Sequence, residues 1–306
     1  MSETPEDIPY DRQAHAAGEL AQLNDSVRRL IAPNGGPYTF TGTCTYIVGR
    51  GRVAVIDPGP DDAAHIAMLA DTLRGEQIEQ ILVTHTHHDH SPGARLLKEM
   101  TGAPIIGCAP HVPTQRAISG QLDARHDQDH HPDQIMQDGD VLSGHGYTLR
   151  ALFTPGHASN HLCFAYDEER LLFSGDHVMA WSTTVVGPPD GNMCDYMASL
   201  DKLRARDDLI YWPGHGGAVR DPHRFTRALA GHRRYREQAI LAAVTQGVNT
   251  IPAIVAKIYD GLDPRLQRAA GLSVLAHLED LMARGLVRMF GDDALSARFE
   301  RTSLLP

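Results

Sequence analysis

The chain of 306 residues has a net charge of −10, with 42% hydrophobic and 22% charged residues. This composition is typical of a globular protein long enough to bury a full core, as one large domain plus a small one. No apolar run approaches the ~18–20 residues of a membrane span, and the acidic N-terminus lacks the order of a secretory signal. We therefore expect a cytoplasmic protein that makes no membrane contact.

The charge is unevenly distributed, because residues 1–219 carry a net charge of −14 and residues 220–306 carry +4. An acidic first part is poorly suited to holding a polyanion by charge alone, whereas the mildly basic end leaves nucleic-acid binding open. The four cysteines are widely separated and form no Cys-x-x-Cys motif, so we expect buried free thiols in a reducing compartment. They are Cys44, Cys108, Cys163 and Cys194.

The first part of the chain reads as alternating strands and helices after a polar lead-in at residues 1–24. Apolar runs and turn residues predict strands and helices in this order: strands at 27–31, 43–48 and 52–57, a helix around 66–73, a strand at 81–83, a helix at 94–100 and a strand at 104–108. Residues 114–137 show no periodicity, and their His-rich tract 125–133 is expected to be a solvated loop near the site. Further strands are predicted at 148–153, 162–166, 171–174 and 209–212, with a helix at 196–206.

After residue 217 the pattern becomes mostly helical. Helices are predicted at 223–246, from 250 onward and at 264–284, followed by a hairpin of 286–290 with 296–301. Three helices and a two-stranded wing follow the winged-helix order. We therefore predict a lead-in at 1–24, a catalytic domain at 25–219 and a winged-helix-like domain at 220–306.

One turn concentrates metal-binding side chains. Residues 84–93 read Thr-His-Thr-His-His-Asp-His-Ser-Pro-Gly and directly follow the strand at 81–83. Side chains alternate along an extended segment, so His85, His87 and Asp89 face one side. His90 turns back to the same cavity as the helix begins. Three later strands each end, beside Gly or Pro, in one more residue of the same kind, and these are His157, Asp176 and His215.

Imidazoles and carboxylates without a thiolate suit zinc, with iron or manganese as alternatives. The four stretches in this order resemble the metallo-β-lactamase fold superfamily. The resemblance implies an α/β fold, an αββα sandwich, with two Zn²⁺ ions: three histidines hold one ion, three residues hold the other, and a carboxylate bridges them. The resemblance assigns His85, His87 and His157 to the first ion and Asp89, His90 and His215 to the second. The bridging carboxylate would be Asp176.

The resemblance also implies a mechanism. Two zinc ions lower the pKa of a bridging water from ~15.7 towards ~7, which makes hydroxide available for hydrolysis. Asp89 would orient this nucleophile or accept its proton, and His161 would meet the substrate or be a hydrogen-bonded residue at a strand start. Flavodiiron proteins of the superfamily have Glu where this chain has His87, which favours a hydrolase; mononuclear-iron sulfur dioxygenases remain an alternative.

Other polar residues near the motifs have supporting or structural interpretations. Asp57 is expected to orient a ligand histidine, and Thr84 either does the same or is a plain strand residue. His88 is predicted not to be a ligand. His111, His145 and His177 are expected to be structural or exposed.

Longer stretches are similar to one branch of the superfamily. Residues 34–43, the Thr-Pro-Gly-His-x-x-x-His run and residues 195–200 resemble the β-lactamase-like protein 2 group. That group joins the hydrolase domain to a C-terminal winged helix, and its characterised animal member cleaves single-stranded RNA. Cys44 stands where the group usually has Asn, so substrate contacts are expected to differ there.

Three functions follow from these observations. The first is hydrolysis of an ester-like or phosphodiester bond, including single-stranded RNA. The second is thioesterase or lactonase activity on small acyl compounds, and the third is a metal-containing winged-helix regulator. On the helix at 264–284, the polar face mixes acidic and basic residues with His277, so it lacks a basic stripe. The cluster of Arg233, Arg234 and Arg236 is the better nucleic-acid candidate or else a solvated helix face. We expect the C-terminal domain to cover one side of the cleft or to form a homodimer.

Overall fold

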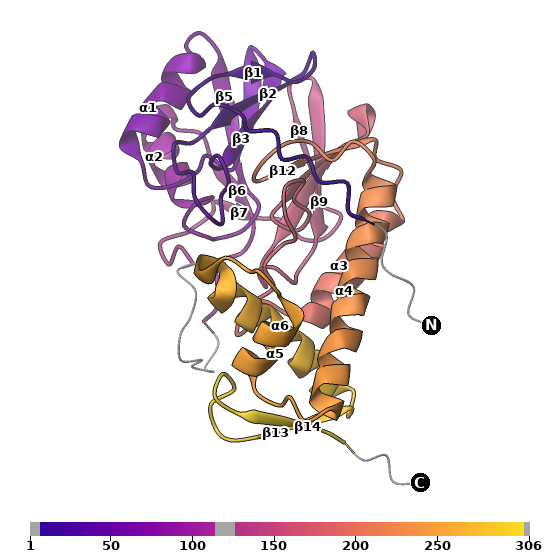
Figure 1. The fold of residues 1–306 in the computed structure, drawn as a ribbon. Helices are drawn as coiled ribbons and strands as arrows, with labels where there is room; N and C mark the ends of the chain where they lie inside the picture. Colours follow the sequence, from indigo (N-terminus) through magenta and orange to yellow (C-terminus); the bar gives the residue numbers. More distant parts are fainter. Residues whose placement is uncertain (1–6, 114–125, 303–306) are drawn as a thin grey trace.

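Two β-sheets form the centre of the molecule in the computed structural model, which describes residues 7–113 and 126–302 (Figure 1). The first sheet has the order β1 (Ala21–Gln22), β2 (Val27–Ile31), β3 (Cys44–Arg50), β4 (Arg52–Ile56), β5 (Gln77–Val83), β6 (Ile105–Gly107) and β7 (Gln134–Ile135). The second has the order β12 (Ile210–Pro213), β11 (Leu171–Gly175), β10 (Leu162–Tyr166), β9 (Tyr147–Phe153) and β8 (Val141–Gly144). A 3₁₀ turn, η1 (Asp167–Glu169), joins β10 to β11.

Helices cover the outer face of each sheet. On the first sheet lie α1 (Ala63–Thr72) and α2 (Pro92–Thr101), and on the second α3 (Met193–Arg204) and the first half of α4 (Pro222–Thr245). The side chain of Asp62 caps α1 by accepting from the next turn, and Pro92 occupies the first turn of α2, where no backbone donor is needed. The layers are helix, sheet, sheet, helix, and the predicted fold class is confirmed.

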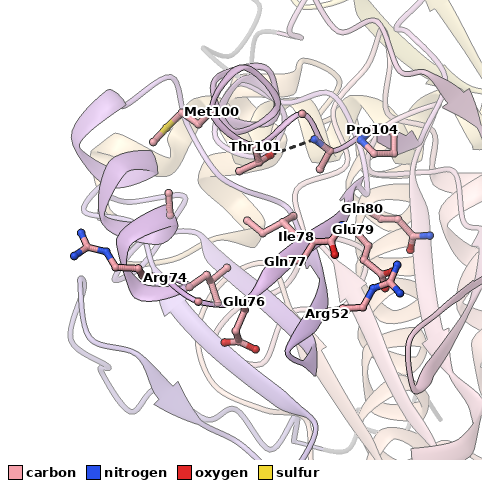
Figure 2. A pocket seen from close by; sticks show the side chains of 15 residues that line it. Arg52, Arg74, Glu76, Gln77, Ile78, Glu79, Gln80, Met100, Thr101 and Pro104 are labelled. Atoms are coloured by element: carbon pink, nitrogen blue, oxygen red, sulfur yellow. Dashed lines mark hydrogen bonds and ion pairs between the residues drawn. The ribbon is translucent and has the colours of Figure 1, made fainter.

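The two ends of β5 have different surroundings. Its first residue, Gln77, lines a cavity of about 690 Å³ together with the ends of α1 and α2, where Arg52 and Glu79 form an ion pair at 2.5 Å (Figure 2). Its last residue, Val83, delivers the turn that carries the predicted metal ligands. The cavity in Figure 2 therefore lies at the opposite end of the strand from the candidate site.

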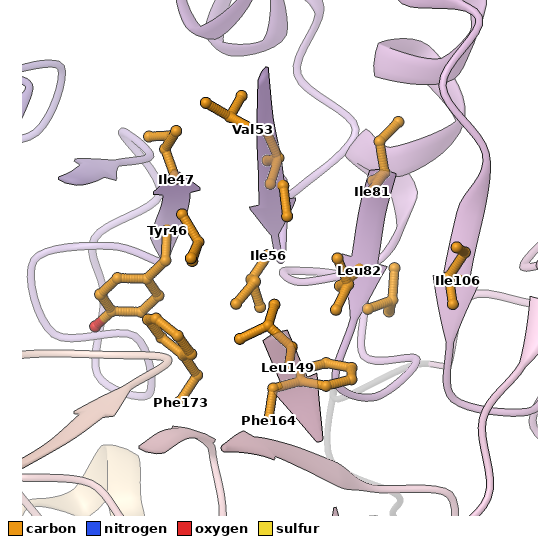
Figure 3. Packing of buried hydrophobic residues seen from close by; sticks show 14 of the residues in the cluster. Tyr46, Ile47, Val53, Ile56, Ile81, Leu82, Ile106, Leu149, Phe164 and Phe173 are labelled. Atoms are coloured by element: carbon orange, nitrogen blue, oxygen red, sulfur yellow. The ribbon is translucent and has the colours of Figure 1, made fainter. Parts of the chain in front are cut away.

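The alternation of side chains in the first sheet builds two packing layers at once. In Figure 3, Tyr46, Ile56 and Leu82 point toward Phe164 and Phe173 of the second sheet. The rings of Tyr46 and Phe173 lie 5.1 Å apart. Ile47, Val53 and Ile81 point the opposite way, toward the face of the sheet that α1 and α2 cover. Strands buried on both faces read as continuous apolar runs, which made them easy to predict.

The C-terminal part has the winged-helix order that was predicted. It contains α5 (Ile251–Ile258), a 3₁₀ turn η2 (Pro264–Leu266), α6 (Gln267–Ala283) and the antiparallel pair β13 (Val287–Phe290) and β14 (Arg298–Arg301). Helix α4 serves both parts: Phe225 and Leu229 pack in the core of the second sheet, and Ile240 and Val244 in the C-terminal core. The exact domain boundary near residue 220 stays a prediction.

Several details differ from the sequence-based expectations. The polar lead-in is partly ordered, since β1 pairs with β2 and the ring of Tyr10 packs edge-on against Phe225. Strands β7 and β8 were not predicted, because each is short and largely exposed. Cys194 is exposed, whereas the other three cysteines are buried as expected.

The long C-terminal helices also hold more buried polar side chains than predicted. His277 was placed on the polar face of its helix, but its exposed fraction is 2%. Arg233 is 4% exposed and lies over the ring of Tyr196, so the three arginines do not form one solvated or basic face; of these, Arg234 is exposed. Within residues 7–113 and 126–302, no helix has the length and apolar character needed to cross a membrane.

Candidate metal centre

The predicted ligands come from four chain segments that meet at one edge of the two sheets. The turn after β5 carries four of them, the β9–β10 connection carries His157, and the ends of the parallel strands β11 and β12 carry Asp176 and His215. Backbone hydrogen bonds join these segments across the sheets. The Cys44 N–H donates to the Gly214 carbonyl at 2.7 Å, and the Leu162 N–H donates to the Thr84 carbonyl at 2.8 Å.

Three imidazoles converge on one side of the site. The Nδ1 atom of His87 lies 2.9 Å from Nε2 of His85 and 3.0 Å from Nε2 of His157. His87 can place at most one proton between itself and these two neighbours, so their lone pairs exceed the available donors. Ligands 2.0–2.1 Å from a tetrahedral ion are about 3.3 Å apart, close to these separations. The donor set fits a divalent metal ion.

Four ligand histidines are oriented by oxygen atoms on the side of the ring away from the site. Each has its Nδ1 atom beside an oxygen, which leaves Nε2 to face the site. The partners are Thr84 Oγ1 for His85 at 2.9 Å, Asp57 Oδ2 for His90 at 2.9 Å, the Val185 carbonyl for His157 at 2.7 Å and the Gly42 carbonyl for His215 at 3.2 Å. These contacts fix which nitrogen is presented to an ion.

Asp57 supports two segments of the turn. Its carboxylate accepts from the Thr84 N–H at 2.8 Å, the Thr84 hydroxyl at 2.7 Å and the His90 ring. Its backbone φ is +48°, an uncommon value for a residue other than glycine, which marks a position constrained by its surroundings. Both Asp57 and Thr84 therefore have the supporting geometry proposed for them.

Two carboxylates complete the set. Asp89 Oδ2 lies 3.1 Å from His215 Nε2, and Asp176 Oδ2 lies 3.4 Å from the same atom and 3.6 Å from His157 Nε2. Asp176 thus stands between the two histidine groups, as a bridging residue must. Its buried Oδ1 atom has no hydrogen-bond partner among the described residues. A Cβ at Gly214 would lie 2.5 Å from this atom, so the close approach requires glycine.

The two halves of the site differ in protonation. Burial lowers the pKa values of His85 and His87, and neighbouring imidazoles lower them further, so both are neutral at pH 7. Burial also lowers the pKa of His215, but Asp176 and Asp89 outweigh it and raise that pKa to about 10. One half presents lone pairs directly, whereas the other must release a proton when an ion binds.

His161 occupies a different place from the other predicted catalytic residue, Asp89. The side chain of Asp89 is 28% exposed, whereas His161 is fully buried. His161 Nδ1 lies 2.9 Å from Thr154 Oγ1, and its Nε2 accepts from the backbone N–H of Asp176 at 3.2 Å. With both nitrogens engaged, these contacts favour positioning of Asp176, and the catalytic role of His161 stays a prediction.

The remaining histidines divide between exposed and buried positions. His88 and His145 are exposed, as expected. His177 is buried beside the ring of Tyr196, and burial lowers its pKa to about 3. The tract from 125 to 133 lies next to the site but is not simply solvated: His126 pairs with His87 in a short β-bridge, and His130 is buried. Arg125 lies outside the described residues.

Sequence reasoning missed the contacts that come from the backbone and from the loop after β11. The carbonyls of Gly42 and Val185 hold two ligand histidines, and a carbonyl is common to every residue, so no sequence signal marks it. Thr184 donates from its hydroxyl to the Asp176 carbonyl at 2.7 Å. Thr184 lies outside every motif, so the sequence did not indicate this role.

Comparison with known protein families agrees with the geometry. The sequence model of the Metallo-beta-lactamase superfamily matches residues 37–215, and that of the Beta-lactamase associated winged helix domain matches residues 250–295. Both regions match the architecture described above.

Curated relatives cover most of the chain. Lactamase-like protein adaB of Aspergillus niger is 29% identical over 82% of this chain and 78% of its own length. The atrochrysone carboxyl ACP thioesterase AgnL7 of Paecilomyces divaricatus is 31% identical over 73% of this chain and 66% of its own length.

Solved structures show the same fold over nearly the whole chain. A beta-lactamase domain protein from Burkholderia ambifaria superposes with a TM-score of 0.77 at 20% identity, covering 95% of each chain. A metallo-beta-lactamase family protein from Thermus thermophilus gives a TM-score of 0.74 at 24% identity, covering 92% of this chain and 100% of the other.

Proposed function

Because the chain belongs to the metallo-beta-lactamase superfamily, we propose that it is a metal-dependent hydrolase of acyl thioesters. The observation that carries the metal-dependent part is the convergence of imidazole lone pairs that no donor satisfies, around His87 Nδ1. We propose His85, His87 and His157 as one ligand set and Asp89, His90 and His215 as the other, with Asp176 between them. Zinc is the first choice for this donor set, with iron or manganese as alternatives.

The chemistry divides between the ions and the chain. Bound divalent ions would polarise the acyl carbonyl and lower the pKa of a water molecule at the site. Asp57 and Thr84 hold the ligand imidazoles in fixed orientations, which keeps the site preorganised. Asp89 is the partly exposed carboxylate of the set, and we propose that its Oδ2 atom orients the attacking water and accepts its proton.

Two observations favour a thioester over RNA. AgnL7 and the similar protein of Aspergillus fumigatus are both named atrochrysone carboxyl ACP thioesterases, and each is 31% identical to this chain. Residues 1–219 carry a net charge of −14, which disfavours binding of a polyanion. The arginine cluster Arg233, Arg234 and Arg236 does not form one exposed basic face, since Arg233 is buried and Arg236 donates to the Ile258 carbonyl.

The RNA and regulator hypotheses predict different behaviour. An RNA hydrolase would need the same metal set but a cationic path for the strand. A regulator would have no need for a complete ligand set around a partly exposed carboxylate. We keep both as outcomes of the experiment below.

The test uses the full chain, its metal content and a substrate panel of acyl-CoA and acyl-carrier thioesters, lactones and single-stranded RNA. We expect thioester turnover with bound metal, and a loss of about a thousand-fold in kcat/KM for Asp176→Ala, or about 4 kcal/mol of transition-state stabilisation. His88→Ala is the matched control, because His88 is exposed and should leave metal content and turnover unchanged.

Three results would overturn the proposal in different ways. Turnover in a metal-poor Asp176→Ala protein would remove the metal-dependent mechanism. Cleavage of RNA without turnover of any thioester, lost in Asp176→Ala, would replace the substrate class. A metal-bound protein inactive on the whole panel would favour the regulator.

A further inference from the structure

A second group of metal-binding side chains lies beside the central site. His111 follows β6, His126 lies eight residues before β7, and Asp190 lies in the loop that precedes α3. Their donor atoms all lie within 4.8 Å of one another. None of the three is part of the central ligand set, and only His126 lies in a segment that the sequence singled out, the His-rich tract 125–133.

The geometry of this group is compact. The rings of His111 and His126 are stacked, with centroids 3.6 Å apart and planes within 3° of parallel, so one ring must turn about its Cβ–Cγ bond before both nitrogens point at the same ion. Both face the same carboxylate: His111 Nδ1 lies 3.5 Å from Asp190 Oδ1, and His126 Nε2 lies 3.2 Å from Asp190 Oδ2. Two ligands of one tetrahedral ion are about 3.3 Å apart, so these separations fit a shared ion.

Two atoms of the group lack partners. His111 Nδ1 and Asp190 Oδ1 are buried, and neither has a hydrogen-bond partner among the described residues. The two side chains are 9% and 12% exposed. A buried lone pair and a buried carboxylate oxygen 3.5 Å apart cost free energy unless an ion or a water molecule lies between them.

The surroundings hold the group in a form that can bind an ion. His126 Nδ1 lies 2.8 Å from Thr86 Oγ1, which can accept the ring proton at Nδ1 when an ion replaces the proton that Nε2 otherwise donates to Asp190. The Ser159 N–H donates to Asp190 Oδ2 at 3.0 Å. Burial lowers the pKa of His111, which keeps this imidazole neutral. Burial alone would raise the pKa of Asp190, but hydrogen bonds from His126 and Ser159 hold it well below its usual range.

We propose that His111, His126 and Asp190 bind a third divalent cation, separate from the ions of the central set. Two imidazoles and one carboxylate are a donor set for zinc or a similar transition metal. The ion would tie the loop after β6 to the loop before α3. Because the ring of His126 lies 4.7 Å from that of His87, it would also fix one wall of the central site.

Metal stoichiometry of the full chain tests this proposal. After equilibration with buffered free Zn²⁺ and desalting, we expect Asp190→Asn and His111→Gln each to hold one zinc per chain fewer than the wild type. His145→Gln is the matched control, since His145 is exposed on the β8–β9 turn and should leave the zinc content unchanged. Asp176→Ala should lose zinc from the central set and keep the third ion.

Anomalous diffraction at the zinc edge gives a second readout that does not depend on any variant. A peak between His111 and Asp190 is the expected result. Central peaks without one there, together with equal zinc content in the wild type and both variants, would overturn the proposal; the group would then be a hydrogen-bonded cluster in which His126 donates to Asp190.

Discussion

Histidines are buried both in the central site and in the layer where α4 packs against α6, here called the packing layer. The groups around them differ in charge. In the central site, His90 and His215 each have Nδ1 beside an oxygen and Nε2 beside a carboxylate. In the packing layer, neither ring nitrogen of His277 has a hydrogen-bond partner among the described residues.

The difference shows how neighbouring charge decides what a buried imidazole does. Carboxylates beside a histidine create a place for a cation, whether a proton or a metal ion. Cations beside a histidine exclude the proton, so the group is stable only while it is neutral. The first arrangement produces a binding site, and the second produces a fold that acid weakens.

The largest expected effect comes from removing the charge that orients the central site. The Asp57 carboxylate accepts through both oxygens, from the Thr84 N–H at Oδ1 and from the Thr84 hydroxyl and the His90 ring at Oδ2. Asp57→Asn leaves only one acceptor oxygen and no charge. We expect metal affinity to fall by about 10- to 100-fold, measured by competition with a chromogenic chelator. Asn tolerates the positive φ at this position, so the backbone should be kept.

Asp62→Asn is the matched control for this change. Asp62 caps α1, and Asn caps a helix equally well, so metal affinity should stay at the wild-type value. Equal affinities in Asp57→Asn and the wild type would show that the His90 orientation does not depend on the carboxylate.

An intermediate effect is expected in the packing layer as the pH falls. Burial and, to a smaller extent, the neighbouring cations together lower the pKa of His277 to about 3; these neighbours are Arg233, His232, Arg284 and Arg236. The unfolded chain takes up a proton near pH 6.5, whereas the folded chain resists it, so stability is lost as the pH falls from 6.5 towards 3. One such group costs about 2 kcal/mol by about pH 5.

His277→Leu removes this group while keeping an apolar side chain of similar size. The difference in unfolding free energy between the variant and the wild type should grow in favour of the variant between about pH 7 and pH 5, measured by urea denaturation. His145→Leu at an exposed position should follow the wild type across this range. A constant difference for His277→Leu would contradict the assigned protonation.

The smallest effect concerns the contact between the two regions. Arg233 of α4 donates to the Thr184 carbonyl, and the Thr184 hydroxyl donates to the carbonyls of Asp176 and His177 at 2.7 and 3.1 Å. Thr184→Val removes this donor with little change in shape. We expect a loss of about 1 kcal/mol in stability, measured by urea denaturation, and a small decrease in metal affinity.

Thr183→Val provides the adjacent control, since that side chain makes no hydrogen bond among the described residues and is only half buried. If both variants behave alike, the Thr184 hydroxyl does not help to hold Asp176.

Much of the architecture and the central site could be predicted from the sequence because the signals are local. Strands buried on both faces appear as continuous apolar runs, and α5 and α6 appear as periodic ones. The turn from His85 to His90 places four candidate ligands within six residues of a strand end. Predictions failed where burial depends on distant partners, as at His277 and Arg233, whose helix positions alone suggested a polar face.

The sequence by itself determined the αββα fold, the winged-helix order and the residue types available at the strand ends. Only the tertiary structure decided which of them meet. Asp176 reaches both histidine groups because β11 and β12 are parallel and end at the same edge. His111 and Asp190 come together from loops 79 residues apart, since convergence of side chains depends on how loops pack and leaves no repeat or spacing in the chain.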